Sequence, residues 1–172
     1  MMSTPAPTVS GGAVFLSSAI ARFQSQKELA EKALAQIGDE DLFWSPGEES
    51  NSIAILMQHV AGNMLSRWTD FLTTDGEKPS RQRDAEFEAG LRTREELMES
   101  WNAGWKCLFD AVTPLRDEDL LKTITIRNEP HSVIDAILRQ LSHYSQHVGQ
   151  IVYIAKSRRD TSWQTLSMPR KR

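Results

Sequence analysis

The chain has 172 residues, of which 40% are apolar and 25% charged, and its net charge is -3 at pH 7. This composition is typical of a soluble globular protein of one domain and lacks the clustered basic residues of nucleic-acid binding proteins. No apolar run reaches the roughly 20 residues of a membrane span, and the single cysteine excludes an intramolecular disulfide. We therefore expect a cytoplasmic protein that binds neither nucleic acid nor membranes, with no secretory signal.

Four segments with helical periodicity account for most of the sequence. Residues 1–12 are rich in small residues, proline and glycine, so we expect this segment to be disordered and residues 13–172 to form a single domain. Apolar residues recur at intervals of three and four in the rest of the chain, which predicts helices over residues 13–37, 51–72, 93–112 and 132–157.

Local signals support the starts of these helices. Asn51 or Ser52 is a suitable N-cap for the second helix. Thr93 and Glu96 have the spacing of a capping box at the start of the third.

The connections between the helices differ in length and character. We expect residues 39–47 to form a loop and residues 123–126, which alternate and are β-branched, to be extended. Residues 73–92 form a long charged connection, and such connections are usually functional or allow a crossover. It would let the third helix start at the other end of the molecule. The predicted fold class is all-α, a four-helix bundle with a long connection between helices 2 and 3.

Three histidines lie on the predicted helices. His143 and His147 are four residues apart, so they lie on one face with about 6 Å of axial rise between them. His59 lies in an apolar stretch of the second helix. Neutral imidazoles bind divalent metal ions, and a site with only three protein ligands keeps a position open, as catalytic sites do. The sequence therefore predicts a metal site at His59, His143 and His147. The alternative is a chance pair with His59 as a hydrogen-bonded core residue.

Other polar residues are weaker candidates. His131 lies twelve residues before His143, off its face, and is expected at a helix start. No glutamate follows His143 directly, so the metalloprotease signature His-Glu-x-x-His is absent. No carboxylate of the fourth helix lies near the pair, so a general base would have to come from elsewhere. Candidates to orient a ligand or to contact a substrate anion are Asn63, Arg67, Gln140 and Gln150.

Most aromatic residues are expected to pack in the core or an interface. This expectation covers both tyrosines and four tryptophans, namely Tyr144, Tyr153, Trp44, Trp68, Trp101 and Trp105. The C-terminal segment contains apolar residues that would pack back onto the helices, namely Trp163, Leu166 and Met168.

The histidine pattern resembles the DinB/YfiT-like superfamily of metal-dependent enzymes. Residues 52–68, 83–87 and 140–151 are similar to an uncharacterised DinB-like subfamily, and the resemblance covers residues 14–168. It implies a four-helix bundle in which three histidines hold nickel, zinc or another divalent ion. Many members of the superfamily are homodimers, so the resemblance also implies a homodimer. Relatives include thiol-dependent transferases and isomerases that use bacillithiol, mycothiol or glutathione. Only the metal-binding triad can be matched residue by residue.

The sequence is compatible with three functions. The first is a metal-dependent enzyme that acts on a small molecule. It would be a thiol-dependent S-transferase, with a low-molecular-weight thiol as partner, or a hydrolase. The second is a non-catalytic dimeric helical bundle that binds a metal or small molecule. The third is a bundle whose histidines are hydrogen-bonded and metal-free.

Overall fold

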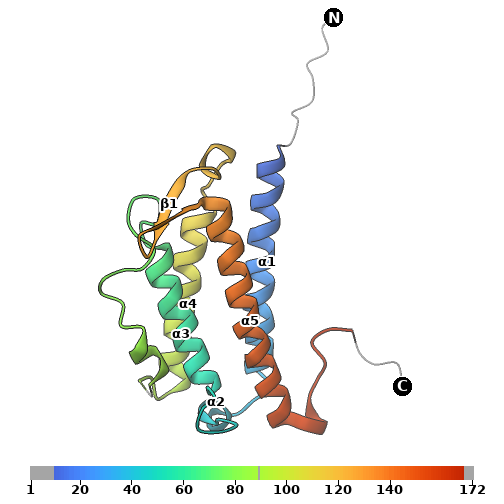
Figure 1. Ribbon diagram of the computed structural model, residues 1–172. Coiled ribbons are helices and arrows are strands. Elements are labelled where there is room, and N and C mark those ends of the chain that lie inside the picture. Colours follow the sequence, from blue (N-terminus) through green and yellow to red (C-terminus); the bar gives the residue numbers. More distant parts are fainter. Residues whose placement is uncertain (1–9, 89, 169–172) are drawn as a thin grey trace, which may run out of the picture.

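The structure is a computed structural model that describes residues 10–88 and 90–168. Four long helices lie side by side (Figure 1), namely α1 (Gly11–Leu34), α3 (Ile53–Trp68), α4 (Arg94–Val112) and α5 (Val133–Arg159). Helix α3 packs most extensively on α4, and α1 on α5. The segment 1–12 that we expected to be disordered lies largely outside the described residues, and the single domain stays a prediction.

Side-chain caps begin all four long helices. The Ser10 hydroxyl accepts a hydrogen bond from the Ala13 backbone N–H at 3.1 Å, so α1 begins two residues before its expected start. Ser52 caps α3, and Ser132 caps α5 in the same way. Both hydrogen bonds of the predicted capping box between Thr93 and Glu96 are present in α4.

A short helix, α2 (Asp39–Phe43), replaces part of the loop predicted over residues 39–47. Three acidic residues occupy its first turn, where the helix dipole favours negative charge. Leu42 is buried and anchors α2 on the long helices. Helix α3 ends at Trp68, four residues before its predicted end, and Asp70 follows with a φ of 47°, which an α-helix cannot accommodate.

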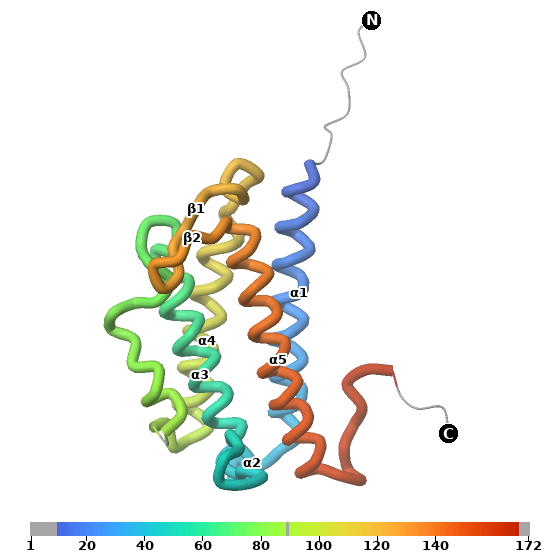
Figure 2. Tube along the Cα trace, viewed as in Figure 1, coloured from blue at the N-terminus to red at the C-terminus, as the bar shows by residue number. Residues whose placement is uncertain are grey.

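The long connection between α3 and α4 is a crossover, as predicted. It runs back along α3 to the end of the molecule near α2, where α4 begins (Figure 2), so α3 and α4 run in the same direction. It includes a short 3-10 helix, η1 (Asp84–Phe87), which packs against α3.

The expectation of an all-α fold is wrong in one respect, because two short strands form an antiparallel hairpin. Strand β1 (Thr123–Ile126) corresponds to the predicted extended piece, and it pairs with β2 (Glu129–Ser132). Ile124 and Ile126 point into the core, which explains the alternation in β1. The sequence of β2 is Glu-Pro-His-Ser, which has no strand propensity, so only its pairing with β1 makes it a strand.

The hairpin is fixed to the long connection. Arg127 and Asn128 form its turn with φ of 56° and 63°, and both backbone N–H groups donate to the Asp75 carboxylate at 2.9 and 2.8 Å. The Gly76 N–H donates to the Thr125 carbonyl at 2.8 Å. The start of the connection therefore has a defined position.

The core holds most of the aromatic residues, as expected. Trp68, Trp101, Trp105 and Tyr144 are fully buried, whereas Tyr153 is 72% exposed and does not pack in the core. Trp163 and Leu166 pack against the core, but Met168 does not, because 92% of it is exposed.

Helices α3 and α4 approach closely at one glycine. A Cβ on Gly104 would lie 2.9 Å from the Cα of Ala61, so only glycine fits there without a shift of the backbone. Among the described residues, no helix has the length and hydropathy needed to cross a membrane.

Candidate metal centre

The structure brings the three predicted histidines together. His59 projects from α3, and His143 and His147 project from successive turns of α5. The Nε2 atom of His143 lies 3.0 Å from Nε2 of His147 and 3.3 Å from Nε2 of His59. One nitrogen from each ring lies within 4.8 Å of the other two. The geometry therefore fits three ligands around one small ion.

Hydrogen bonds on the far side of two rings set the direction of their lone pairs. Nδ1 of His59 lies 2.8 Å from a Glu86 oxygen, and Nδ1 of His147 lies 2.9 Å from the Gln150 amide oxygen. Both oxygens accept, so each Nδ1 carries the proton, and each neutral ring keeps a lone pair on Nε2. Both lone pairs face Nε2 of His143. A single proton on that nitrogen can donate a full hydrogen bond to only one of them. A cation would accept all three nitrogens.

Burial favours the neutral form of the α5 histidines. His59 is 5% exposed, and the other two are partly buried. Burial, together with the neighbouring His147 and His59, lowers the pKa of His143 to about 3. Burial also lowers the pKa of His147. At neutral pH these rings therefore have the protonation state that a metal ion requires of its ligands.

A buried carboxylate orients His59. Glu86 belongs to η1, is 8% exposed, and receives two hydrogen bonds from the Arg81 guanidinium at 2.7 Å each. Burial alone would raise its pKa, but the hydrogen bonds from His59 and Arg81 outweigh burial and lower the pKa of Glu86. Gly62 makes room for it, because a Cβ there would lie 2.9 Å from the Glu86 Cδ. A carboxylate behind a ligand histidine is a common arrangement in metal sites.

A second carboxylate extends this network. Glu77 accepts a hydrogen bond from Arg81 at 3.0 Å and another from Arg127 at 3.3 Å, and it lies 3.7 Å from the Arg67 Nη2. These groups come from α3, the long connection and the hairpin. The ion pairs therefore connect three parts of the chain beside the histidines.

Glu86 and Arg81 are the residues that sequence analysis missed. Both lie in the irregular connection, where no periodicity indicates which side chain approaches α3. The likeness of residues 83–87 to the DinB-like subfamily is the one sequence signal that points to Glu86.

The other candidates have different positions. Gln150 contacts His147 directly, and the Asn63 amide oxygen accepts from the buried Tyr144 hydroxyl at 3.0 Å. Arg67 and Gln140 line a small cavity beside His59 and His143. His131 is not one of the three convergent histidines, as expected, but it lies in β2, just before the start of α5, and its ring contacts Asp135.

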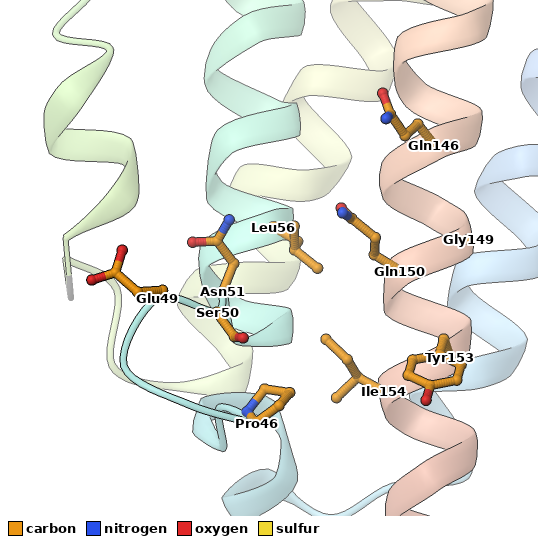
Figure 3. Close-up of a pocket in the computed structure, with 10 residues that line it drawn as sticks. All are labelled: Pro46, Glu49, Ser50, Asn51, Leu56, Gln146, Gly149, Gln150, Tyr153 and Ile154. Atoms are coloured by element: carbon orange, nitrogen blue, oxygen red, sulfur yellow. The ribbon is translucent and has the colours of Figure 1, made fainter.

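A cavity of about 510 Å³ lies on the Gln150 side of the centre. Gln146 and Gln150 extend from α5 towards the start of α3, where Asn51 and Leu56 lie opposite (Figure 3). Its lining is both polar and apolar. Because Gln150 also contacts His147, the side chain of Gln150 lies between this cavity and the His147 imidazole.

Comparisons with known proteins support the fold. The sequence profile of the family described as "Protein of unknown function (DUF1572)" matches residues 10–172. The chain is similar to the crystal structure of a conserved protein from Enterococcus faecalis, with a TM-score of 0.63 and 17% identity, over 81% of this chain and 94% of that one. At this identity the likeness concerns the fold alone. No curated protein matches the chain.

We predict that acid destabilises the metal-free protein through His143. Its pKa falls from 6.5 in the unfolded chain to about 3 in the folded protein, so between these values the unfolded chain binds more protons. The free energy of unfolding therefore decreases as the pH falls below 6.5. Urea denaturation in the presence of a chelator would measure this between pH 6.5 and 5, above the range in which Glu86 titrates. His143→Gln should show a shallower decline, and equal slopes for both proteins would contradict the prediction.

Proposed function

The chain belongs to the DUF1572 family, a family with a DinB-like fold, and we propose that it is a metal-dependent enzyme with His59, His143 and His147 as metal ligands. The observation that carries this proposal is the convergence of three Nε2 atoms, two of which have lone pairs directed by hydrogen bonds to Glu86 and Gln150. We further propose that the four long helices form the four-helix bundle of the DinB/YfiT-like superfamily.

The donor set suits nickel or zinc. Imidazole nitrogens favour borderline divalent ions of the first transition row over magnesium or calcium, which prefer oxygen ligands. No carboxylate is among the three convergent residues. Three protein ligands leave coordination positions for a substrate, as in catalytic zinc sites.

The proposed reaction class is a thiol-dependent S-transfer or a hydrolysis. A divalent ion bound here would supply Lewis acidity, which lowers the pKa of a thiol or water molecule. The chain would contribute orientation, because Glu86 fixes the ring of His59 and Gln150 fixes that of His147. The cavity beside Gln150 has the size of a small-molecule site, which supports a low-molecular-weight thiol as partner.

The alternative is a non-catalytic dimer whose metal only stabilises the helices. The support for a dimer is the likeness to the DinB/YfiT-like superfamily, which has many homodimeric members. A homodimer and a cytoplasmic location are both proposed for the enzyme as well, and light scattering would test the first. The partial exposure of His143 and His147 favours the enzyme, because a purely structural site is usually closed.

We predict that the protein purified without a histidine tag binds one equivalent of nickel or zinc. His147→Ala should weaken metal binding by more than about 100-fold, because it removes a direct ligand and outer residues alone account for 10–100-fold. His131→Ala is the matched control, since His131 lies outside the centre. Elemental analysis after dialysis would measure the stoichiometry. Full stoichiometric metal in His147→Ala would refute the ligand assignment.

Glu86→Gln tests the orienting carboxylate. It keeps a hydrogen-bond acceptor for His59 but removes the negative charge, so we expect metal affinity to fall by about 10–100-fold with stoichiometry unchanged at saturation. Asp84→Asn makes the same chemical change on an exposed residue of η1 and should leave the affinity unaltered. Competition with a chelator would measure both affinities, and equal values for the two variants would argue against this role.

A thiol panel tests the reaction class. We expect the metal-loaded protein to accelerate loss of thiol groups when bacillithiol, mycothiol or glutathione is mixed with a generic electrophile. The metal-free protein and His147→Ala should leave the rate at its uncatalysed value. If no thiol is consumed faster, the S-transferase is ruled out for this panel and the hydrolase or the binding module takes precedence.

A further inference from the structure

Five arginines surround a cavity of about 200 Å³ beside the proposed metal centre. The lining combines them with two amides and the rings of two of the histidines, namely Arg67, Arg81, Arg83, Arg127, Arg139, Asn63, Gln140, His59 and His143. No carboxylate lines it. The arginines come from α3, α5, the long connection and the hairpin, which are far apart in the sequence.

The charge around this cavity is not balanced within the described residues. Three carboxylates lie within ion-pair distance of the five guanidinium groups, namely Glu77, Glu86 and Asp84. Five positive and three negative groups leave an excess of two positive charges. Arg139 has no ion pair there, and it is exposed at the cavity mouth. Such an excess attracts anions into the cavity.

Arg67 is a buried charged side chain with unsatisfied hydrogen-bond donors. It is 3% exposed, and its Nε and Nη1 atoms have no hydrogen-bond partner among the described residues. Burial lowers its pKa from the ordinary value, since the guanidinium has lost its hydration. Glu77 lies 3.7 Å from the Arg67 Nη2 and compensates the buried charge only in part, which costs free energy. The Arg67 guanidinium is part of the cavity lining, so its positive charge adds to the attraction for an anion there.

We propose that this cavity is a subsite for an oxyanion, the carboxylate or phosphate group of a small substrate, next to the metal centre. Guanidinium groups bind both anions through paired hydrogen bonds. The volume suits one such group and a few further atoms, because one water occupies about 30 Å³ of liquid. The identification of the occupant as a substrate rests on the proposed function, but the binding of the anion does not.

The two cavities give the subsite a place in the proposed reaction. His59 and His143 border the arginine cavity, whereas Gln150, which contacts His147, borders the larger cavity. An anionic substrate on the arginine side and a thiol on the Gln150 side would approach the three histidines from different directions.

Binding of inorganic phosphate and of succinate to the metal-free protein tests the subsite. Isothermal titration calorimetry at constant ionic strength should show saturable binding of at least one anion to the wild type and to His147→Ala. Arg139→Gln should weaken it by about 10-fold, because one charge-assisted hydrogen bond is lost. Arg22→Gln, an exposed arginine of α1 outside the cavity, removes the same charge and should bind as the wild type does. The tighter of the two anions identifies the type of oxyanion.

Arg67→Gln is the second variant, with its fold checked by circular dichroism, and it should bind at least as weakly as Arg139→Gln. Absence of saturable binding in the wild type, or equal binding by the wild type, Arg139→Gln and Arg22→Gln, would overturn the subsite. The metal analysis gives an independent result. Phosphate binding without stoichiometric metal would support the subsite and contradict the metalloenzyme. Stoichiometric metal without anion binding would support the metalloenzyme and contradict the subsite.

Discussion

The hydrogen bond between Glu86 and His59 is the interaction on which the proposed centre depends. It fixes the ring of the one histidine of the three that does not come from α5, and it requires a carboxylate to be buried, which is costly unless the charge is compensated. Arg81 supplies that compensation with two hydrogen bonds at 2.7 Å. Because Nδ1 of His59 faces Glu86, its Nε2 is the nitrogen that faces His143.

The same network positions the irregular part of the chain. From His59 the contacts pass through Glu86, Arg81 and Glu77 to Arg67 and Arg127, so positive and negative groups alternate. A buried ion pair contributes little net stability, but a chain of complementary charges disfavours other arrangements of the segment that carries them. The long connection has few apolar side chains to bury, and its position is therefore determined by these polar contacts and by its hydrogen bonds to the hairpin.

Sequence analysis predicted the parts of the site that lie on regular helices. The spacing of His143 and His147 places both on one face, and His59 lies on the buried side of an apolar helix, so their convergence follows from packing the two helices. Glu86 could not be found in this way, because its position depends on a turn of η1 and on the space left by Gly62. Helix α2 and strand β2 were missed for a similar reason. Their propensities are weak, and contacts with the rest of the chain decide their conformation.

The arrangement separates two kinds of electrostatic environment across the histidines. On the side of His59, buried guanidinium groups and carboxylates create fixed charges with an excess of positive charge. On the side of His147, amides, apolar side chains, an aromatic ring and the carboxylate of Glu49 line a larger cavity that contains no arginine. A positive field next to His143 disfavours its protonation, as does its burial, so the arginines and the desolvation act in the same direction. The positive charge that attracts an anion therefore also keeps the nearby imidazole unprotonated, the form in which its nitrogen can bind a cation.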